Sequence, residues 1–552
     1  MILTLDIETN TTHDTIWCCG VAVDGETCVH DTPEPIQEMV DKADLIVGHN
    51  IIGFDAPLLR KLWAIKIPEE KLRDTLLLSR LYHPSLTGGH SLAAWGERMG
   101  FSKGDFTDYD GGLSDAMIDY CERDVEITVK LYAKLMADLA TEGFKDPCID
   151  IEHKVASIIR EQTENGFKLD IEKATDIYTE VSARMNAIEA ELQEVFPPIV
   201  EERWSEKTGK RLKDSVEVFN VGSRQQIAKR LQSIGVKFTQ ITEETEKGGG
   251  GNIKVDEDIL GGIDVPEAQL IAEYLMLQKR SSQVDSWFKF VKEDGRVHGR
   301  VITNGAVTGR MTHQDPNMAQ IPAKGKPYGE ACRQCWIVDE GNKLVGIDAS
   351  GLELRMLAHY MDDEDYTREV LDGDIHTANM KAAGLTERSQ AKTFIYAFLY
   401  GAGAGKIGSI VGGSYKQGQK LIDQFLENTP ALAALKAKVA RIASNGSLPG
   451  LDGRRLRVRS EHAALNTLLQ GAGAIVMKQA LINLKEALER SNIPYLFVAN
   501  VHDEWQIETP EYFAPFVGKA GVRAIRKAGE DLGLRCPLDG EYNIGDNWAE
   551  TH

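Results

Sequence analysis

Two short apolar runs far apart in the sequence each end on an aspartate. The first run, Leu344–Ile347, is followed by Asp348, and Gly351 then interrupts the pattern before a stretch with helical apolar spacing. This arrangement is typical of a buried strand that leads into a helix. The second run, Tyr495–Val501, reaches Asp503 and is followed by another apolar stretch, which predicts a hairpin with Asp503 at its turn.

An aspartate at the end of a buried strand has two interpretations. Taken alone, Asp348 is most simply a cap for the helix that follows it. Two such acids in one cleft would instead hold a pair of divalent cations, because hard cations prefer carboxylate oxygens and paired metal ions stabilise both oxygens of a phosphoryl transfer. The sequence therefore predicts that Asp348 and Asp503 meet at a two-metal site.

The composition describes an ordinary soluble protein of three or four domains. The chain has 552 residues, and neither its first residues nor any apolar run fits a signal peptide or a membrane span, so a cytoplasmic location and no membrane partner are expected. Its net charge of −21 argues against binding nucleic acid by overall charge, although a local basic track is compatible with it. Cys332-x-x-Cys335 lacks a second pair, which favours a structural role over a zinc site.

A cluster of acids is predicted in the first part of the chain. Asp6 and Glu8 are two residues apart on a predicted strand, so both side chains project from one face. Asp55 follows a second strand end, and Tyr120 and Asp124 share one face of a predicted helix. Singly, these acids are most simply solvated surface groups. Together, four acids can hold two divalent metals, and a phenol can orient an attacking water.

A helix predicted over Thr386–Gly401 carries polar and aromatic residues at a regular interval. Arg388, Lys392, Tyr396 and Tyr400 recur every four residues and form one stripe that drifts by about 40° per step. Two cations followed by two aromatic rings suit a nucleotide, because the cations can pair with the triphosphate and the rings can pack on the base and sugar. The alternative is an amphipathic helix whose aromatic residues belong to the core.

The middle of the chain is predicted to be mainly helical. Long helices are expected over 173–194 and 272–290, and the second carries Lys279 and Arg280, which suit either duplex phosphates or a solvated face. The glycine-rich stretch 247–252 lacks the residues of a phosphate-binding loop and predicts a flexible tip.

The order of the acids in the first part, D-x-E, then N-x-x-x-x-D, then Y-x-x-x-D, resembles the proofreading 3′–5′ exonuclease domain of the DEDD superfamily, tyrosine subtype. The resemblance implies that Asp6, Glu8, Asp55 and Asp124 bind metal and that Tyr120 assists the water.

The later motifs resemble those of family A (DNA polymerase I-type) DNA polymerases, and more narrowly the replicative polymerases of T-seven-like podovirus phages. The matching segments are Thr308–Arg310, Asp348–Leu357, Lys392–Gly403, His462–Gln470 and Asn547–Ala549. The implied fold class is α/β multidomain, with a ribonuclease H-like exonuclease domain and a right-hand polymerase domain of palm, fingers and thumb. The implied boundaries are 1–145 for the exonuclease domain, 146–300 for connecting helices and thumb, about 375–445 for the fingers, and 301–374 with 446–552 for the palm.

The resemblance also implies roles for single residues. Asp348 and Asp503, with the carbonyl of Ala349, bind two Mg²⁺ ions, and Lys392 protonates the departing pyrophosphate. The expected nucleotide contacts are Glu353, His376, Arg388, Lys392, Tyr396 and Tyr400. The expected DNA contacts are Arg310, Gln470, His502, Lys279 and Arg280.

The predicted function is template-directed 5′–3′ DNA synthesis from dNTPs with 3′–5′ proofreading, in phage genome replication. Two Mg²⁺ ions are expected in each site, with Mn²⁺ as a substitute, and the expected partners are primer-template DNA and a phage helicase-primase. The alternatives are a repair or lesion-tolerant polymerase of this family, a phage-type RNA polymerase and a non-catalytic processivity factor.

Two further expectations follow from the resemblance. Some relatives carry a long basic thumb insertion that recruits thioredoxin, but only about twenty residues separate Pro198 from Phe219, so thioredoxin dependence is not expected. Relatives with Phe at the position of Tyr396 discriminate against dideoxynucleotides, so this chain is expected to accept them readily.

Overall fold

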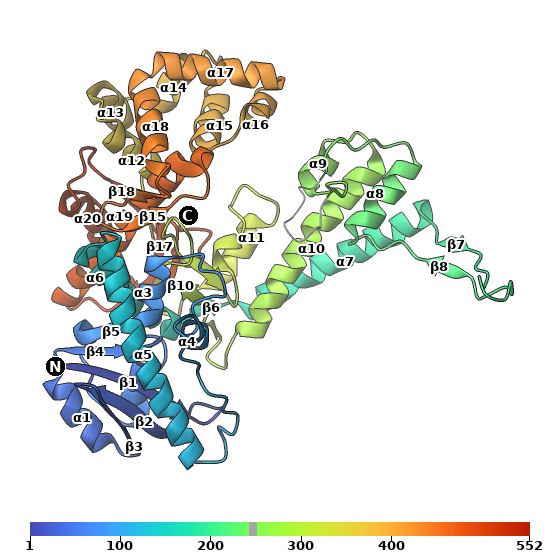
Figure 1. Cartoon of the computed structure of the whole chain (residues 1–552). Coiled ribbons are helices and arrows are strands. Elements are labelled where there is room, and N and C mark those ends of the chain that lie inside the picture. The colour runs from blue at the N-terminus through green and yellow to red at the C-terminus, as the bar shows by residue number, and fades with distance from the viewer. Residues whose placement is uncertain (242–250) are drawn as a thin grey trace.

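The computed structural model describes residues 1–241 and 251–552, so most of the predicted tip over 247–252 lies outside the described residues. Figure 1 shows a sheet domain at the amino-terminal end, a central sheet, a layer of helices beyond that sheet, and an arm that projects sideways. No helix within the described residues has an apolar stretch long enough to cross a membrane.

The amino-terminal domain is built on a five-stranded mixed sheet in the order β3-β2-β1-β4-β5. The central strand β1 is antiparallel to β2 and parallel to β4. The strands are β1 (Ile2–Thr9), β2 (Ile16–Val23), β3 (Glu26–His30), β4 (Leu45–Gly48) and β5 (Leu72–Asp74). The helices are α1 (Pro33–Lys42), α2 (Asp55–Leu62), α3 (Thr75–Tyr82), α4 (Leu92–Arg98) and α5 (Asp115–Thr141).

The arm rises from a small three-stranded sheet in the order β12-β6-β9. Its strands are β6 (Phe167–Leu169), β9 (Arg296–Val297) and β12 (Trp336–Ile337). Cys332 and Cys335 are both buried beside Trp336 at this root, in the arm's apolar core. The arm contains α7 (Ile171–Val195), β7 (Ile199–Glu201), β8 (Ser215–Glu217), α8 (Arg224–Ser233), α9 (Glu257–Gly261) and α10 (Pro266–Phe290).

Helices α7 and α10 pack side by side along the arm. The first agrees with the predicted helix over 173–194. The second begins six residues before the predicted start at 272, because Pro266 occupies its first turn, where a missing amide hydrogen costs nothing.

The central sheet is four-stranded and antiparallel, in the order β16-β17-β13-β18. Helix α20 packs on it, α19 packs against α20, and α12 leads from it toward the helical layer. Its strands and helices are β13 (Asn342–Ala349), β16 (Leu496–Val501), β17 (Glu504–Pro510), β18 (Gly540–Gly545), α12 (Leu352–Met361), α19 (Ala464–Arg490) and α20 (Ala514–Asp531). The helical layer contains α13 (Glu364–Leu371), α14 (Ile375–Ala383), α15 (Arg388–Leu399), α16 (Ala404–Ile410), α17 (Tyr415–Asn428) and α18 (Pro430–Ala443).

The remaining helices and strands connect these parts. They are η1 (Glu69–Lys71), α6 (Asp146–Asn165), β10 (Arg300–Ile302), β11 (Thr312–Gln314), η2 (Met318–Gln320), α11 (Gly329–Gln334), β14 (Ser447–Pro449), β15 (Arg455–Arg457), η3 (Glu461–Ala463) and η4 (Glu511–Phe513). Among them, α6 packs on α19 and on β16, and so joins the amino-terminal domain to the central sheet.

A buried group of charges holds α6 against α19. Glu152 on α6 accepts hydrogen bonds at Oε1 from Arg454 Nη1 (2.6 Å) and Lys478 Nζ (2.5 Å), and Asp452 pairs with the same guanidinium. All four side chains are at most 5% exposed. Because none can be solvated by bulk water, each depends on its partners for compensation.

Replacing Glu152 by Ala is expected to lower the free energy of unfolding by about 3–5 kcal/mol, because Arg454 and Lys478 would remain buried without their carboxylate. Chemical denaturation measures the change. The matched control is Glu486→Ala, which removes an exposed pair with Lys154 between the same two helices and should cost less than about 1 kcal/mol. Equal losses from the two variants would contradict the prediction.

Candidate active sites

The first candidate site lies where β13 ends beside the β16–β17 turn. Asp348 stands opposite Glu504 in the antiparallel register of β13 and β17, and the amide of Ala349 donates to the carbonyl of Asp503 at 3.1 Å. His502 adopts a φ of 57°, which makes the tight turn that leads into β17. The structure thus brings together the two strand-end aspartates that the sequence places far apart.

Glu504 is held by hydrogen bonds of its own. Its carboxylate accepts from Gln506 Nε2 and Trp548 Nε1, each at 2.5 Å, and lies 2.7 Å from Nδ1 of His552. Burial raises its pKa, but these partners outweigh the burial and lower the pKa overall. Glu504 is therefore a fixed, fully bonded acid that supports the turn.

The carboxylate of Asp348 is not held by a comparable set of hydrogen bonds. Its Oδ1 is shielded from solvent and has no hydrogen-bond partner among the residues described by the structure. Burial, together with the charges of Asp503 and Glu504, raises the pKa of Asp348 to about 7. A shielded, unpartnered carboxylate oxygen beside further acids fits a ligand for a hard cation.

Helix α15 presents the predicted stripe away from its core face. Arg388 and Lys392 are exposed, Tyr396 is half-buried and Tyr400 is 46% exposed. The buried face of the helix consists instead of Ala391, Phe394, Ile395, Phe398 and Leu399. Tyr396 packs partly against the core, whereas Lys392 and Tyr400 are exposed to a ligand.

Glu353 on α12 accepts hydrogen bonds from two other residues that were predicted to contact nucleotide or DNA. Its Oε1 accepts from Nη2 of Arg310 at 3.0 Å, and its Oε2 accepts from the hydroxyl of Tyr400 at 2.7 Å. The rings of Tyr396 and Tyr400 lie 6.3 Å apart, and the ring of His376 lies 6.2 Å from that of Tyr396. The loop before β11, α12, α14 and α15 thus converge above the two aspartates.

Arg388 is bound to an acid in this structure. Its Nε and Nη2 donate to Asp374 at 2.7 and 3.0 Å, and the same carboxylate caps α14. This guanidinium lowers the pKa of Asp374 below its usual range. A triphosphate that bound Arg388 would have to compete with Asp374.

The remaining predicted DNA contacts lie on α19 and α10. Gln470 is half-buried on α19. On α10, Lys279 pairs with Glu257 at 2.9 Å, and Nε of Arg280 donates to the carbonyl of Pro327 at 3.3 Å.

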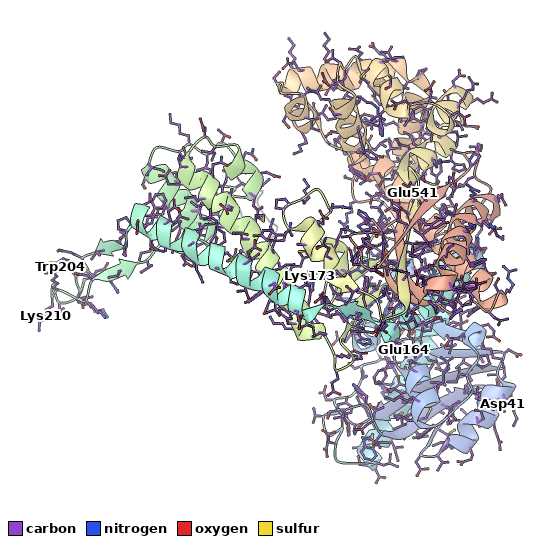
Figure 2. The ribbon with its side chains drawn as sticks, turned by 180° about the vertical axis from the view of Figure 1, so that it is seen from behind. Asp41, Glu164, Lys173, Trp204, Lys210 and Glu541 are labelled. Carbon is purple, nitrogen blue, oxygen red and sulfur yellow. The ribbon has the colours of Figure 1, made fainter. Side chains whose placement is uncertain are left out.

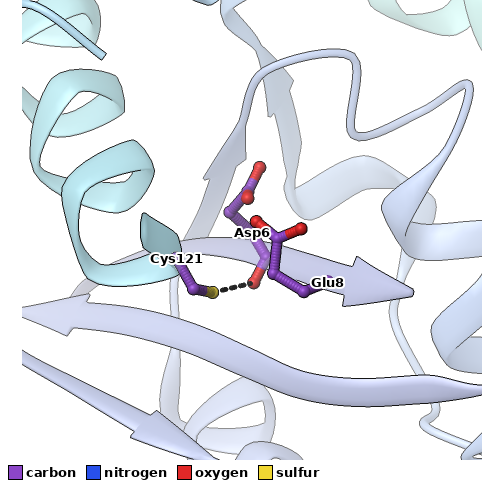
Figure 3. Close-up of side chains that lie close together, drawn as sticks. All are labelled: Asp6, Glu8 and Cys121. Atoms are coloured by element: carbon purple, nitrogen blue, oxygen red, sulfur yellow. Dashed lines mark hydrogen bonds between the residues drawn. The ribbon is translucent and has the colours of Figure 1, made fainter. Parts of the chain in front are cut away.

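The second candidate site lies on the amino-terminal sheet. Asp6 and Glu8 project from the same face of β1, as predicted, and one ligand atom from each lies with Sγ of Cys121 within a mutual distance of 4.8 Å. Figure 3 shows this group, in which the Cys121 thiol donates to the carbonyl of Asp6 at 3.7 Å. Asp55 opens α2 and accepts from the amide of Ile7 at 3.1 Å, which holds it beside the same strand.

The acids of this site raise one another's pKa. Burial is the main cause, and neighbouring acids add to it, so that the pKa of Glu8 is raised to about 8 and that of Asp55 to about 7. Burial and the neighbouring acids likewise raise the pKa of Asp6, whereas burial alone raises the pKa of Asp124, against the opposing effect of Lys103. Asp124 Oδ1 also has no hydrogen-bond partner among the described residues. Clustered, partly uncompensated carboxylates suit divalent cations.

Lys103 was missed by the sequence analysis. Its Nζ forms an ion pair with Asp124 and lies 4.6 Å from the ring centre of Tyr120, so it brings a positive charge among the four acids. Burial lowers the pKa of Lys103, but Asp124 raises it by more, so the side chain stays protonated. Lys103 lies in a loop between α4 and α5, where no periodic pattern marks it.

Asp74 was also missed. This buried acid accepts from the amides of Asn50 (2.9 Å) and Ile52 (3.3 Å) and caps α3. These hydrogen bonds hold the loop that precedes Asp55 in place.

The fold over nearly the whole chain is that of a DNA polymerase domain. A solved structure titled "POL domain of Pol1 from M. smegmatis complex with DNA primer-template and dNTP" superposes with a TM-score of 0.79, covering 99% of this chain and 95% of that one at 19% identity. This likeness defines the fold as that of a right-hand polymerase domain.

The sequence comparisons define the family. Residues 172–550 match the model of DNA polymerase family A. The chain is 35% identical to the DNA-directed DNA polymerase of Escherichia phage T7, covering 99% of both chains, and 26% identical to the thermostable DNA polymerase I of Thermus aquaticus, covering 95% of this chain and 60% of that one. The chain belongs to DNA polymerase family A. The alignment with the phage T7 enzyme spans 706 positions, more than the 552 residues here, so that relative contains segments without a counterpart in this chain.

Proposed function

We propose that this DNA polymerase extends a primer 5′–3′ from dNTPs by two-metal phosphoryl transfer, removes mispaired ends 3′–5′, and replicates a phage genome. The observation that carries the proposal is the meeting of Asp348 and Asp503 beneath the stripe of α15. The full-length likeness to the phage T7 and T3 polymerases supports the replicative role. Primer-template DNA and dNTPs are the proposed substrates, and a phage helicase-primase is the proposed partner in the host cytoplasm.

Asp348, Asp503 and the Ala349 carbonyl would hold two Mg²⁺ ions, or Mn²⁺ in their place, at the polymerase site. The metal ions supply electrostatic stabilisation of the attacking and leaving oxygens. Lys392 and Arg388 bind the triphosphate. Tyr396 and Glu353 pack against the sugar, and Tyr400 lies near the templating base. Arg310 and Gln470 read minor-groove acceptors that every correct pair presents.

At the amino-terminal site, Asp6, Glu8, Asp55 and Asp124 would hold two further metal ions. Asp6 and Glu8 lie on β1, the central strand of a mixed five-stranded sheet, and Asp55 on α2 and Asp124 on α5 lie beside that strand, which supports a ribonuclease H-like nuclease. Tyr120, on the same helix as Asp124, orients the attacking water. Thioredoxin is not required, because the short segment between α7 and α8 forms only a hairpin.

Primer extension with matched and mismatched primers, with dNTPs or rNTPs, tests the proposal. Extension with dNTPs and removal of the mismatched end are the expected results. A protein that extends mismatches without removing them would be a repair or lesion-tolerant polymerase. Preference for rNTPs would indicate an RNA polymerase.

The metal affinity of the exonuclease site is expected to increase with pH. Protons compete with metal for Glu8 and Asp55, whose pKa values are about 8 and 7, so affinity should rise between pH 6.5 and 9, by up to about tenfold per pH unit for each proton released. Mn²⁺ titration calorimetry in the Asp348→Asn/Asp503→Asn background, which leaves the exonuclease acids intact, measures the change. A pH-independent affinity would contradict the prediction.

Tyr396→Phe is expected to reduce ddNTP incorporation relative to dNTP by roughly ten- to a hundredfold. The hydroxyl would replace the contact of the missing 3′-OH, and a hydrogen bond to a charged group is worth about 1.5–3 kcal/mol. Competition between ddNTP and dNTP in a single-turnover assay measures the ratio. Tyr415→Phe, which alters an exposed tyrosine on α17, is the control. An unchanged ratio in the Tyr396 variant would refute this role.

A further inference from the structure

A lysine from the loop between α4 and α5 reaches into the acid cluster of the amino-terminal site. Nζ of Lys103 forms an ion pair with Oδ2 of Asp124, lies 4.6 Å from the ring centre of Tyr120 and hydrogen-bonds to the hydroxyl of that ring. The Lys103 side chain is 24% exposed and that of Asp124 is 2% exposed. The ammonium therefore joins two side chains of α5 that are both assigned to the site.

The two carboxylate oxygens of Asp124 are in different states. Oδ2 is paired with Lys103, whereas Oδ1 is shielded from solvent and has no hydrogen-bond partner in the part of the chain that the structure describes. A carboxylate that is held by one oxygen keeps its other oxygen in a fixed direction, and metal ligands are commonly oriented in this way by a neighbouring group. The pair with Lys103 thus leaves Oδ1 as a pre-oriented ligand.

Lys103 does not balance the charge of every acid in the cluster. Among the described residues it forms no ion pair with Asp6, Glu8 or Asp55. A cation that took the place of a metal ion would pair with Asp6 and Glu8 as well, because a ligand atom of each lies within 4.8 Å of the other. The contacts therefore fit a lysine that positions Asp124, and not one that occupies the metal site.

The loop that carries Lys103 also fixes the ring of Tyr120. The ring of Phe106 lies 5.5 Å from that of Tyr120, and the hydroxyl of Tyr109 donates to the hydroxyl of Tyr120 at 3.4 Å. The carbonyl of Tyr109 in turn accepts from Nε1 of Trp17 on β2 at 2.8 Å, which ties the loop to the sheet. The position of the Tyr120 hydroxyl is thus set by the loop as well as by α5.

We propose that Lys103 is a positioning residue of the exonuclease site, which holds Asp124 by Oδ2 so that Oδ1 is left for a metal ion, and which fixes the Tyr120 hydroxyl that orients the attacking water. This inference rests on the proposed exonuclease function. Loss of the ammonium should slow the reaction without emptying the metal site, because the four acids that would hold the metal ions remain in place.

Lys103→Met removes the ammonium and keeps an unbranched side chain of similar length. At saturating Mg²⁺, the single-turnover rate of nucleotide removal from single-stranded DNA is expected to fall roughly ten- to a hundredfold. The affinity for Mn²⁺, measured by calorimetry at pH 8 in the Asp348→Asn/Asp503→Asn background, should not fall, because an opposing positive charge is removed and no acid is lost. Lys103→Arg, which keeps the charge, should restore part of the rate.

A double-mutant cycle with Tyr120→Phe tests whether Lys103 acts through its neighbour. The loss of rate in Lys103→Met/Tyr120→Phe is expected to be smaller than the product of the two single losses, because both changes disturb the same hydroxyl. Losses that multiply would overturn the inference.

The matched control is Lys130→Met. Lys130 also lies over an aromatic ring, that of Phe101, but on the exposed face of α5, so its replacement should leave trimming unchanged. Figure 2 shows Asp41 of the amino-terminal domain well apart from Glu541 of the central sheet. Extension of a matched primer should therefore proceed at the wild-type rate in the Lys103 variants, which shows that the chain is folded.

Trimming at the wild-type rate by Lys103→Met would overturn the inference. Loss of Mn²⁺ binding together with trimming would also overturn it, because Lys103 would then be needed to form the metal site and not to position its groups. If the wild-type chain itself neither trimmed single strands nor bound Mn²⁺, the proposed exonuclease would be refuted, and the inference with it.

Discussion

Asp503→Ala is expected to abolish primer extension, lowering its rate by at least about 10³-fold, while the removal of nucleotides from single-stranded DNA continues. Asp348→Ala should have the same effect. Asp348 ends β13 beside the β16–β17 turn that carries Asp503, and the shielded Oδ1 of Asp348 has no partner among the described residues. A single-turnover extension assay with Mg²⁺ measures the loss.

The matched control for this experiment is Glu541→Gln. Glu541 lies opposite Asp348 on the other neighbouring strand, β18, and is exposed. Its replacement removes one negative charge from the same neighbourhood but no proposed ligand, so extension should change by less than about threefold. Synthesis that survived in Asp503→Ala would mean that the protein is not the catalyst and would favour a processivity factor.

Asp6→Ala is expected to have the opposite pattern, with exonuclease activity reduced by at least about 10³-fold and correct incorporation retained. Asp6 and Glu8 share one face of β1, and Asp55 is tied to that strand through the amide of Ile7. The variant should extend mismatched primers that the wild-type protein first trims. Gel analysis of end-labelled single strands and mismatched duplexes measures both effects.

Asp119→Asn provides the control for the exonuclease variant. Asp119 is an exposed acid on α5, next to Tyr120 in sequence, and its change should leave trimming unaffected. If Asp6→Ala degraded single strands at the wild-type rate, the acid cluster would not be a nuclease site, although the polymerase assignment would stand.

The sequence predicted these two sites because each depends on local periodicity. Alternation along β1 places Asp6 and Glu8 together, and the apolar run before Asp348 marks a strand end. Helical spacing likewise predicted the α15 stripe. In each case the position of a side chain follows from its own element.

The residues that were missed depend on contacts distant in sequence. Lys103 reaches Asp124 from a loop, and Glu152 meets Lys478 across a domain boundary. Helix α10 begins before the predicted start at 272, because Pro266 fits the first helical turn. The hairpin before α8 has a polar sequence whose β pairing comes from its turn and not from an apolar pattern.

The two ends of the arm meet at its root. Phe167 on β6 stands opposite Val297 on the antiparallel strand β9, so the polypeptide enters the arm and returns from it through adjacent strands. The segment between these two residues begins and ends at paired strands. A segment whose ends lie close together tolerates insertions, deletions or replacement. The length of the arm can therefore change in evolution without changing the strands that carry Asp348 and Asp503.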